Sequence, residues 1–172
     1  MRHPLSPEVP FIREASVRRR TMAVAVATAL TLGLGVVQAP PADAAFGRLE
    51  KQLLRIVNRT RGRHDLRPLK MDRSLSRPSE KHTRRMIRQD RLFDPPNLEQ
   101  ILAHENWDDL GADVVGCGNT LKELHRILMT EDFHRTILLH SKLRRVGIGV
   151  VAADQRNRCG RGSFWATEIL YG

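Results

Sequence analysis

The amino-acid sequence predicts an α+β fold, in which helices and strands form layers around one sheet. Apolar residues recur at helical spacing in the first half of the predicted domain, and the last third contains two runs rich in β-branched and aromatic residues. Helices therefore precede strands along the chain, an order typical of α+β folds. With 172 residues, 41% of them apolar, the chain can form one ordinary domain with a buried core.

Two helices are predicted at the start of this domain. Residues 49–64 place apolar side chains on one helical face, at Leu49, Leu53, Ile56 and Val57. Residues 74–92 predict a second helix, whose inward-facing residues would be Leu75, His82, Met86 and Ile87. Pro78 must lie in the first turn of that second helix or kink it, because proline has no amide N–H to donate.

The middle of the chain alternates between irregular and regular segments. Residues 93–109 contain two consecutive prolines and little periodicity, which predicts a loop with one short turn of helix. The run "GADVVGCG", residues 111–118, predicts a short strand between glycines. Two short helices follow, over 121–129 and 131–140, and we expect Thr130 to separate them and to cap the second.

The C-terminal segment predicts a β-hairpin. Residues 144–153 and 163–172 are two strand-like runs, and the polar, glycine-containing "DQRNRCGRG" joins them. Without repeats or an internal linker, the sequence indicates a single domain after residue 44.

Residues 1–44 have the layout of a secretory signal peptide. Arg18, Arg19 and Arg20 precede the apolar run "TMAVAVATALTLGLGVV", and Ala42 and Ala44 form an A-x-A cleavage site. The apolar run is shorter than the ~20 residues of a spanning helix, so we expect no stable transmembrane anchor, although an uncleaved anchor is the alternative. The sequence thus predicts a signal peptide over 1–44 and a secreted, extracellular domain over 45–172.

Charge is distributed unevenly along the predicted domain. Residues 48–91 carry a net charge of +10, residues 92–134 carry −7, and residues 135–172 carry +5. A basic surface beside an acidic segment favours an anionic envelope component as partner, and an Arg-rich solvated surface without a ligand is the alternative. We expect no nucleic-acid partner, because aromatic residues make up only 5% of the chain and form no base-stacking platform.

The two cysteines, Cys117 and Cys159, are an even count in an exported chain, which favours a disulfide over two free thiols. A two-cysteine metal site would lack the usual C-x-x-C spacing. The sequence contains no glycine-rich phosphate loop and no G-x-S-x-G motif, which excludes the nucleotide-binding and serine-hydrolase classes that depend on them.

Five segments together resemble the CAP superfamily, which groups cysteine-rich secretory proteins, antigen 5 and pathogenesis-related proteins with bacterial secreted relatives. They are "LLRIVNRTRGRHDLRPLKMDRSLS", "KHTRRMIRQDRLF", "GADVVGCG", "EDFHRTILLHSKLRRVGIGVV" and "FWATEILYG", in the family's order. The most specific part is the histidine-arginine pair followed by a valine-glycine strand. The resemblance implies a three-layer α-β-α sandwich around a small antiparallel sheet. It also implies a central cleft in which two histidines and acidic residues can bind a divalent metal.

The resemblance also locates the cleft residues, and most of them have changed. His134 matches the second cleft histidine, whereas Asp94 occupies the place of the first. In the family's Gly-Glu-Asn motif, Ala112 replaces the glutamate and Asp113 the asparagine. The remaining metal candidate is a weak site formed by His134 and Asp94 with Asp113 or Glu131. We expect no bound cofactor and assign no catalytic residue. His134 paired with Asp94 in a structural polar network is the alternative.

These losses predict a secreted, non-catalytic binding module, monomeric, whose ligand is an envelope component, a lipid or a protein. The alternative is a divalent-metal-dependent hydrolase, peptidase-like or wall-acting, that uses the cleft around His134. A secreted structural protein without a ligand is the third hypothesis.

Overall fold

The computed structural model describes residues 47–105, 107 and 110–172. The predicted signal peptide lies outside the described residues, so the cleavage site stays a prediction. Among the described residues, none of the helices is long and apolar enough to cross a bilayer.

A four-stranded sheet forms the middle layer, in the order β1-β3-β4-β2. The predicted hairpin is present as β3 (Arg145–Ala153) and β4 (Ser163–Tyr171), and β2 (Gly111–Gly118) pairs with β4 in antiparallel orientation. Strand β1 (Lys70–Met71) pairs parallel with β3, so the sheet is mixed rather than wholly antiparallel. The sequence showed only a connector there, because two residues are too few for a periodic pattern.

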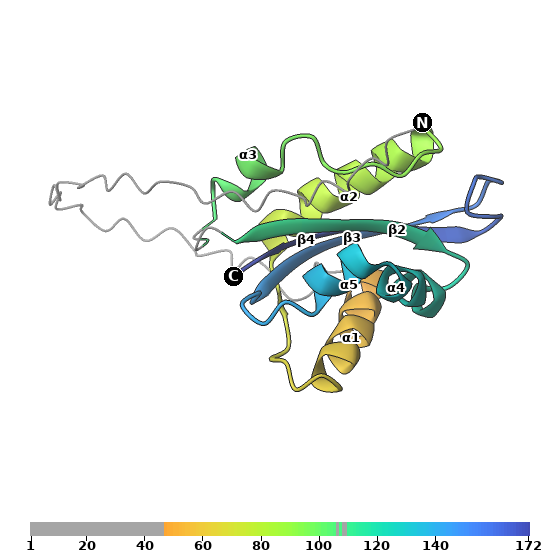
Figure 1. Cartoon of the computed structure of the whole chain (residues 1–172). Helices are drawn as coiled ribbons and strands as arrows, with labels where there is room; N and C mark the ends of the chain where they lie inside the picture. Colours follow the sequence, from red (N-terminus) through yellow and green to blue (C-terminus); the bar gives the residue numbers. More distant parts are fainter. Residues whose placement is uncertain (1–46, 106, 108–109) are drawn as a thin grey trace, which may run out of the picture.

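Helices cover both faces of the sheet (Figure 1). On one face lie α1 (Arg48–Gly62), α4 (Leu121–Thr130) and α5 (Asp132–Leu138), and on the other lie α2 (Arg73–Arg88) and α3 (Leu98–Leu102). This is the three-layer arrangement expected from the sequence. Apolar side chains of α1 and α4 pack with β2, β3 and β4 in the larger core, which includes Leu53, Val57, Leu124, Leu128 and Ile148.

Helix α2 packs directly on β3. A Cβ atom at Gly147 or Gly149 would collide with the backbone of α2, so only glycine permits this approach. The hydroxyl of Ser79 donates to the carbonyl of Gly147 at 3.1 Å, and the hydroxyl of Thr83 donates to that of Gly149 at 2.9 Å. Hydrogen bonds between helix and strand therefore satisfy the buried hydroxyls.

Thr130 does not cap the second short helix as expected, and Pro78 lies beyond the first turn of α2. Thr130 is the last residue of α4 and its hydroxyl donates back to the carbonyl of Ile127, so the break falls at Glu131. Pro78 is the sixth residue of α2, beyond its first turn. The helix nevertheless continues, because Asp72 caps its start by accepting from the amide of Ser74 and the buried face packs on the sheet.

Candidate functional site

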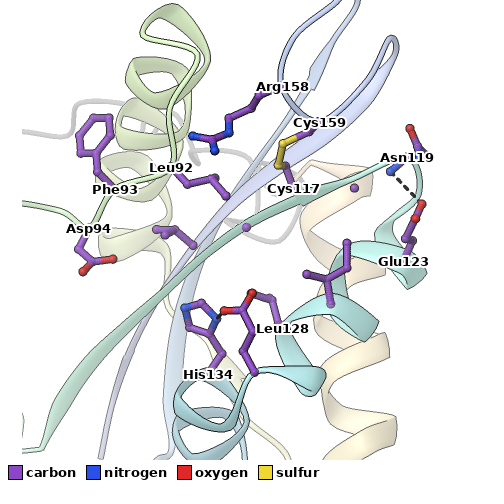
Figure 2. A pocket seen from close by; sticks show the side chains of 15 residues that line it. Leu92, Phe93, Asp94, Cys117, Asn119, Glu123, Leu128, His134, Arg158 and Cys159 are labelled. Atoms are coloured by element: carbon purple, nitrogen blue, oxygen red, sulfur yellow. Dashed lines mark hydrogen bonds and ion pairs between the residues drawn. A yellow bond between two sulfur atoms is a disulfide. The ribbon is translucent and has the colours of Figure 1, made fainter. Parts of the chain in front are cut away.

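A pocket of about 590 Å³ lies along the outer edge of β2 (Figure 2). Its floor is the strand segment from Val115 to Gly118. One wall comes from the loop after α2 and from the β3–β4 hairpin, with Leu92, Phe93, Asp94, Arg158 and Cys159. The other wall comes from α4 and α5, with Glu123, Ile127, Leu128, Glu131 and His134. The pocket is thus a groove with a strand edge between two walls.

His134 stands in the first turn of α5 and points toward this groove (Figure 2). Its Nδ1 is 2.7 Å from Oε2 of Glu131, the distance of an ion pair, although the angles are not those of a hydrogen bond. The imidazole is 15% exposed and the carboxylate 56%. Phe133 beside it is 48% exposed, with ring centroids 5.5 Å apart. Among the described residues, His134 is therefore paired with Glu131 rather than with Asp94.

Asp94 belongs to the opposite wall, where a buried histidine holds its loop. His82 of α2 donates from Nε2 to the carbonyl of Phe93 at 2.7 Å, and the two rings meet edge-on with centroids 4.9 Å apart. Burial lowers the pKa of His82, so the neutral ring serves as a structural donor. The guanidinium groups of Arg85 and Arg91 lie over the Phe93 ring and complete this anchor.

Asp113 lies on β2 near Asp94. Burial, followed by the charge of Asp94, raises the pKa of Asp113 to about 7, and its Oδ2 has no hydrogen-bond partner. Because successive side chains of a strand point to opposite faces, Asp113 faces α2 together with Val115, whereas Ala112 faces α4 with Val114 and Gly116. Neither Ala112 nor Asp113 lines the pocket.

A disulfide closes one end of the groove. Cys117 of β2 and Cys159 of the β3–β4 connection are joined, with their Cα atoms 6.1 Å apart, as the cysteine count predicted. The amide of Arg158 donates to Asp90 at 2.9 Å, which links the connection to the loop after α2. At the same end, the N-cap residue Thr120 accepts from the amide of Glu123, and Glu123 accepts from the amide of Asn119, so both side chains hold the start of α4.

The side chains of this pocket do not fit the metal site that the resemblance implies. His134, Glu131 and Asp94 line one pocket, but Asp94 stands on the wall opposite His134 (Figure 2). Among the described residues, no group of three or more His, Cys, Asp or Glu side chains converges on a point that could hold a metal ion. Ala112 offers no donor, and the expectation that no cofactor binds stays a prediction.

Several pocket residues were missed by sequence reasoning. Ile127, Glu123 and Arg158 line the groove, yet each looks like an ordinary helix or loop residue in the sequence. The predicted disulfide was the one signal available for Arg158, because it would bring residues near Cys159 to the end of the 111–118 strand.

Comparison with protein-family models gives one match, to the cysteine-rich secretory protein family (CAP), over residues 54–169, which is more than half of the chain. The chain belongs to the CAP family. No curated protein sequence matches significantly.

Solved structures of CAP and SCP proteins share this fold. An extracellular SCP-domain protein of Bacillus anthracis matches with a TM-score of 0.55 and 17% identity, over 72% of this chain and 40% of that one. A cysteine-rich secretory protein of Staphylococcus aureus matches with a TM-score of 0.56 and 23% identity, over 72% of this chain and 38% of that one. Venom allergen-like protein 4 of Schistosoma mansoni matches with a TM-score of 0.55 and 9% identity, over 74% of this chain and 90% of that one. The CAP chain described here thus corresponds to about 40% of the two bacterial chains, and at these identities the likeness shows the fold alone.

Proposed function

We propose that this CAP-family chain is an exported, non-catalytic binding module that holds its ligand in the groove along β2. One observation carries the proposal: a pocket of about 590 Å³ is lined by side chains that hold structure rather than form a catalytic set. His134 is engaged by Glu131, and Asp94 lies on the opposite wall. Neither arrangement provides a general base with an oriented nucleophile.

Two findings support the extracellular part of the proposal. The chain contains a disulfide, which persists in oxidising compartments. Two of the structural neighbours are described as an extracellular protein and a secretory protein. The expected ligand is an envelope component, a lipid or a protein.

A pocket-filled variant tests the binding role. Ile127→Trp places an indole in the groove, whereas Lys122→Trp places the same side chain on an exposed position of the same helix. The probes are vesicles of phosphatidylglycerol, an anionic wall polymer and a peptide, and calorimetry measures their affinity for each chain. We expect the probe that binds the parent to bind Lys122→Trp equally well and Ile127→Trp at least tenfold more weakly. Equal binding by all three chains would remove the groove from the function.

The hydrolase alternative has a separate readout. Turnover of casein or wall material that requires added zinc and disappears in His134→Ala would replace the binding proposal with an enzymatic one.

A further inference from the structure

The outer edge of β2 presents backbone groups that the sheet does not use. Strand β2 is an edge strand, with β4 as its neighbour. In an antiparallel pair, residues alternate between those that exchange hydrogen bonds with the partner strand and those that direct both groups away from it. The amide of Gly172 donates to the carbonyl of Leu110 at 3.2 Å, and this pair continues the β2–β4 register. The backbone groups that bond to β4 are therefore those of residues 112, 114, 116 and 118. The N–H and C=O groups that point outward are those of residues 111, 113, 115 and 117.

Two of these outward residues, Val115 and Cys117, line the groove. Among the described residues, the amide and carbonyl groups of Val115 and Cys117 make no hydrogen bond outside the sheet. A row of edge-strand N–H and C=O groups without a protein partner is a template for pairing with another strand, so an occupant that pairs with these groups would be favoured. A lipid chain has no groups that match them, whereas an extended peptide presents the same alternation of donors and acceptors.

The two walls suit a strand-shaped occupant. They rise on either side of β2, so that side chains of an added strand would alternate between Leu128 on one wall and Leu92 on the other (Figure 2). Three carboxylates line the groove, at Asp94, Glu123 and Glu131, against the single guanidinium of Arg158. Among the described pocket residues, negative charge therefore exceeds positive charge, which favours a peptide with basic side chains.

We propose that the groove binds an extended, basic peptide segment of a partner protein, which adds to the sheet as a strand through the backbone of Val115 and Cys117. This inference rests on the proposed binding function and names the ligand class. Main-chain hydrogen bonds would supply affinity, and the walls would select side chains.

A proline substitution tests the backbone contact in the protein. Val115→Pro removes the N–H that points into the groove and leaves the β2–β4 hydrogen bonds intact, because residues 114 and 116 make those bonds. Val115→Ala is the matched control, since it also shortens a buried side chain but keeps the N–H. The probe is a seven-residue peptide of alternating lysine and valine, blocked at both ends, measured by fluorescence anisotropy with the full chain at physiological salt. We expect affinity for Val115→Pro to be at least tenfold below that for Val115→Ala, and equal affinities would overturn the proposal.

N-methylated peptides provide a test that leaves the protein unchanged, so it remains decisive if Val115→Pro does not fold. One peptide carries N-methyl groups on every lysine and the other on every valine. An added strand directs alternate N–H groups to β2, so one methylation pattern should lower affinity at least tenfold and the other should change it less than threefold. An equal effect of both patterns, or no binding of the unmethylated peptide, would contradict strand addition.

A third comparison separates this inference from the proposed function. The matching glutamate–valine peptide should bind at least tenfold more weakly than the lysine–valine peptide, and equal binding would contradict the charge argument. If neither peptide binds but lipid vesicles or the wall polymer bind the parent and not Ile127→Trp, the groove is a binding site and the peptide inference alone fails.

Discussion

At the residue scale, the sheet contains a carboxylic acid without partners. Glu168 of β4 is fully buried, and neither carboxyl oxygen makes a hydrogen bond. The hydroxyl of its neighbour Thr167 lies 2.9 Å from that of Thr83 of α2, so the alternation of the strand places Glu168 on the face covered by α1 and α4. That face is the larger apolar core, in which a charged carboxylate is poorly solvated. Burial raises the pKa of Glu168 to about 8, and the side chain is therefore mainly protonated at neutral pH.

This pKa predicts a pH dependence of stability. Because the folded pKa of about 8 exceeds the ordinary value of 4.5, the folded state binds more protons between these values. The contribution of Glu168 to stability should be largest below pH 4.5 and fall as the pH rises toward 8, by at most about 1.4 kcal/mol per pH unit. Urea unfolding from pH 5 to 9 should show this fall, and Glu168→Gln should flatten most of it.

Two controls belong to that measurement. Asp154→Asn removes an exposed acid and should leave the slope unchanged. Asp113, whose pKa is raised to about 7, adds a slope of the same sign that should persist in Glu168→Gln. An unchanged slope in Glu168→Gln would mean that this carboxyl is hydrated or paired.

A second residue-scale prediction concerns the altered cleft positions. Asp94→His combined with Ala112→Glu should raise zinc affinity at least tenfold, because the two substitutions restore the side chains that the family resemblance places beside His134. Calorimetric titration with zinc measures the gain, and adding His134→Ala to the double variant should abolish it. Tight zinc binding by the parent chain, lost in His134→Ala, would instead show that the native residues form a metal site.

At the element scale, one buried arginine holds α1 against the connection that follows α5. Arg61 is fully buried at the end of α1, and its guanidinium donates to the carbonyls of Arg67, Leu138 and His140 at 3.0, 2.7 and 3.2 Å. These carbonyls lie near the ends of α1 and α5, where helical backbone acceptors lack helical partners. Arg61 thus fixes the end of the helix that carries His134, and its planar fork suits several acceptors at once.

Replacement of Arg61 should therefore destabilise the whole domain. Arg61→Lys cannot reach the same set of carbonyls, and we expect the free energy of unfolding to fall by about 3 kcal/mol. Arg59→Lys, an exposed change on the same helix, should alter it by less than about 0.5 kcal/mol. Urea denaturation of both variants measures these changes. Equal stability of the Arg61→Lys and Arg59→Lys variants would show that the carbonyls find other donors.

The disulfide joins a second pair of elements, β2 and the β3–β4 connection. It closes a loop with a sequence separation of 42, which in the chain-entropy model stabilises by about 4 kcal/mol. Reduction should lower the melting temperature of the parent and leave that of Cys117→Ser/Cys159→Ser unchanged. Mass analysis without reductant should find no free thiol, and two alkylated cysteines in the untreated protein would contradict the pairing.

At the scale of the whole molecule, basic charge and the pocket occupy different places. Exposed basic residues lie on α1 and on α2, which cover opposite faces of the sheet. They are Arg55 and Arg59 on α1, and Arg77, Lys81 and Arg88 on α2. The net charge of +10 over residues 48–91 is thus divided between two outer faces, whereas the groove at the sheet edge contains more acidic side chains than arginines and lysines. Among the ligand classes that the groove could hold, its charge therefore favours a basic peptide.

Export is the prediction that belongs to the whole chain. The charged segment, apolar run and A-x-A site predict that the mature protein begins near Ala45. N-terminal sequencing of material from the medium should start there, and a protein that retains "AVAVATAL" would indicate a membrane anchor instead.

The sequence by itself determined the type and order of the main elements. Periodic apolar residues predicted α1, α2 and the β3–β4 hairpin, and the even cysteine count predicted the pair Cys117–Cys159. These features depend on local spacing or on a small inventory of residues, so a single sequence contains them. The predicted end of α4 was wrong by one residue. The hydroxyl of Thr130 can either cap the next helix or donate to a carbonyl of its own helix, and the sequence does not show which.

Only the tertiary structure decided what surrounds each side chain. It paired β1 with β3, placed His134 beside Glu131 and Asp94 across the groove, and buried Glu168 without a partner. It also set the register that directs the amides of Val115 and Cys117 outward, since strand order and pairing join residues more than forty positions apart. Such contacts are long-range, and no periodicity within one segment specifies which other segment will face it.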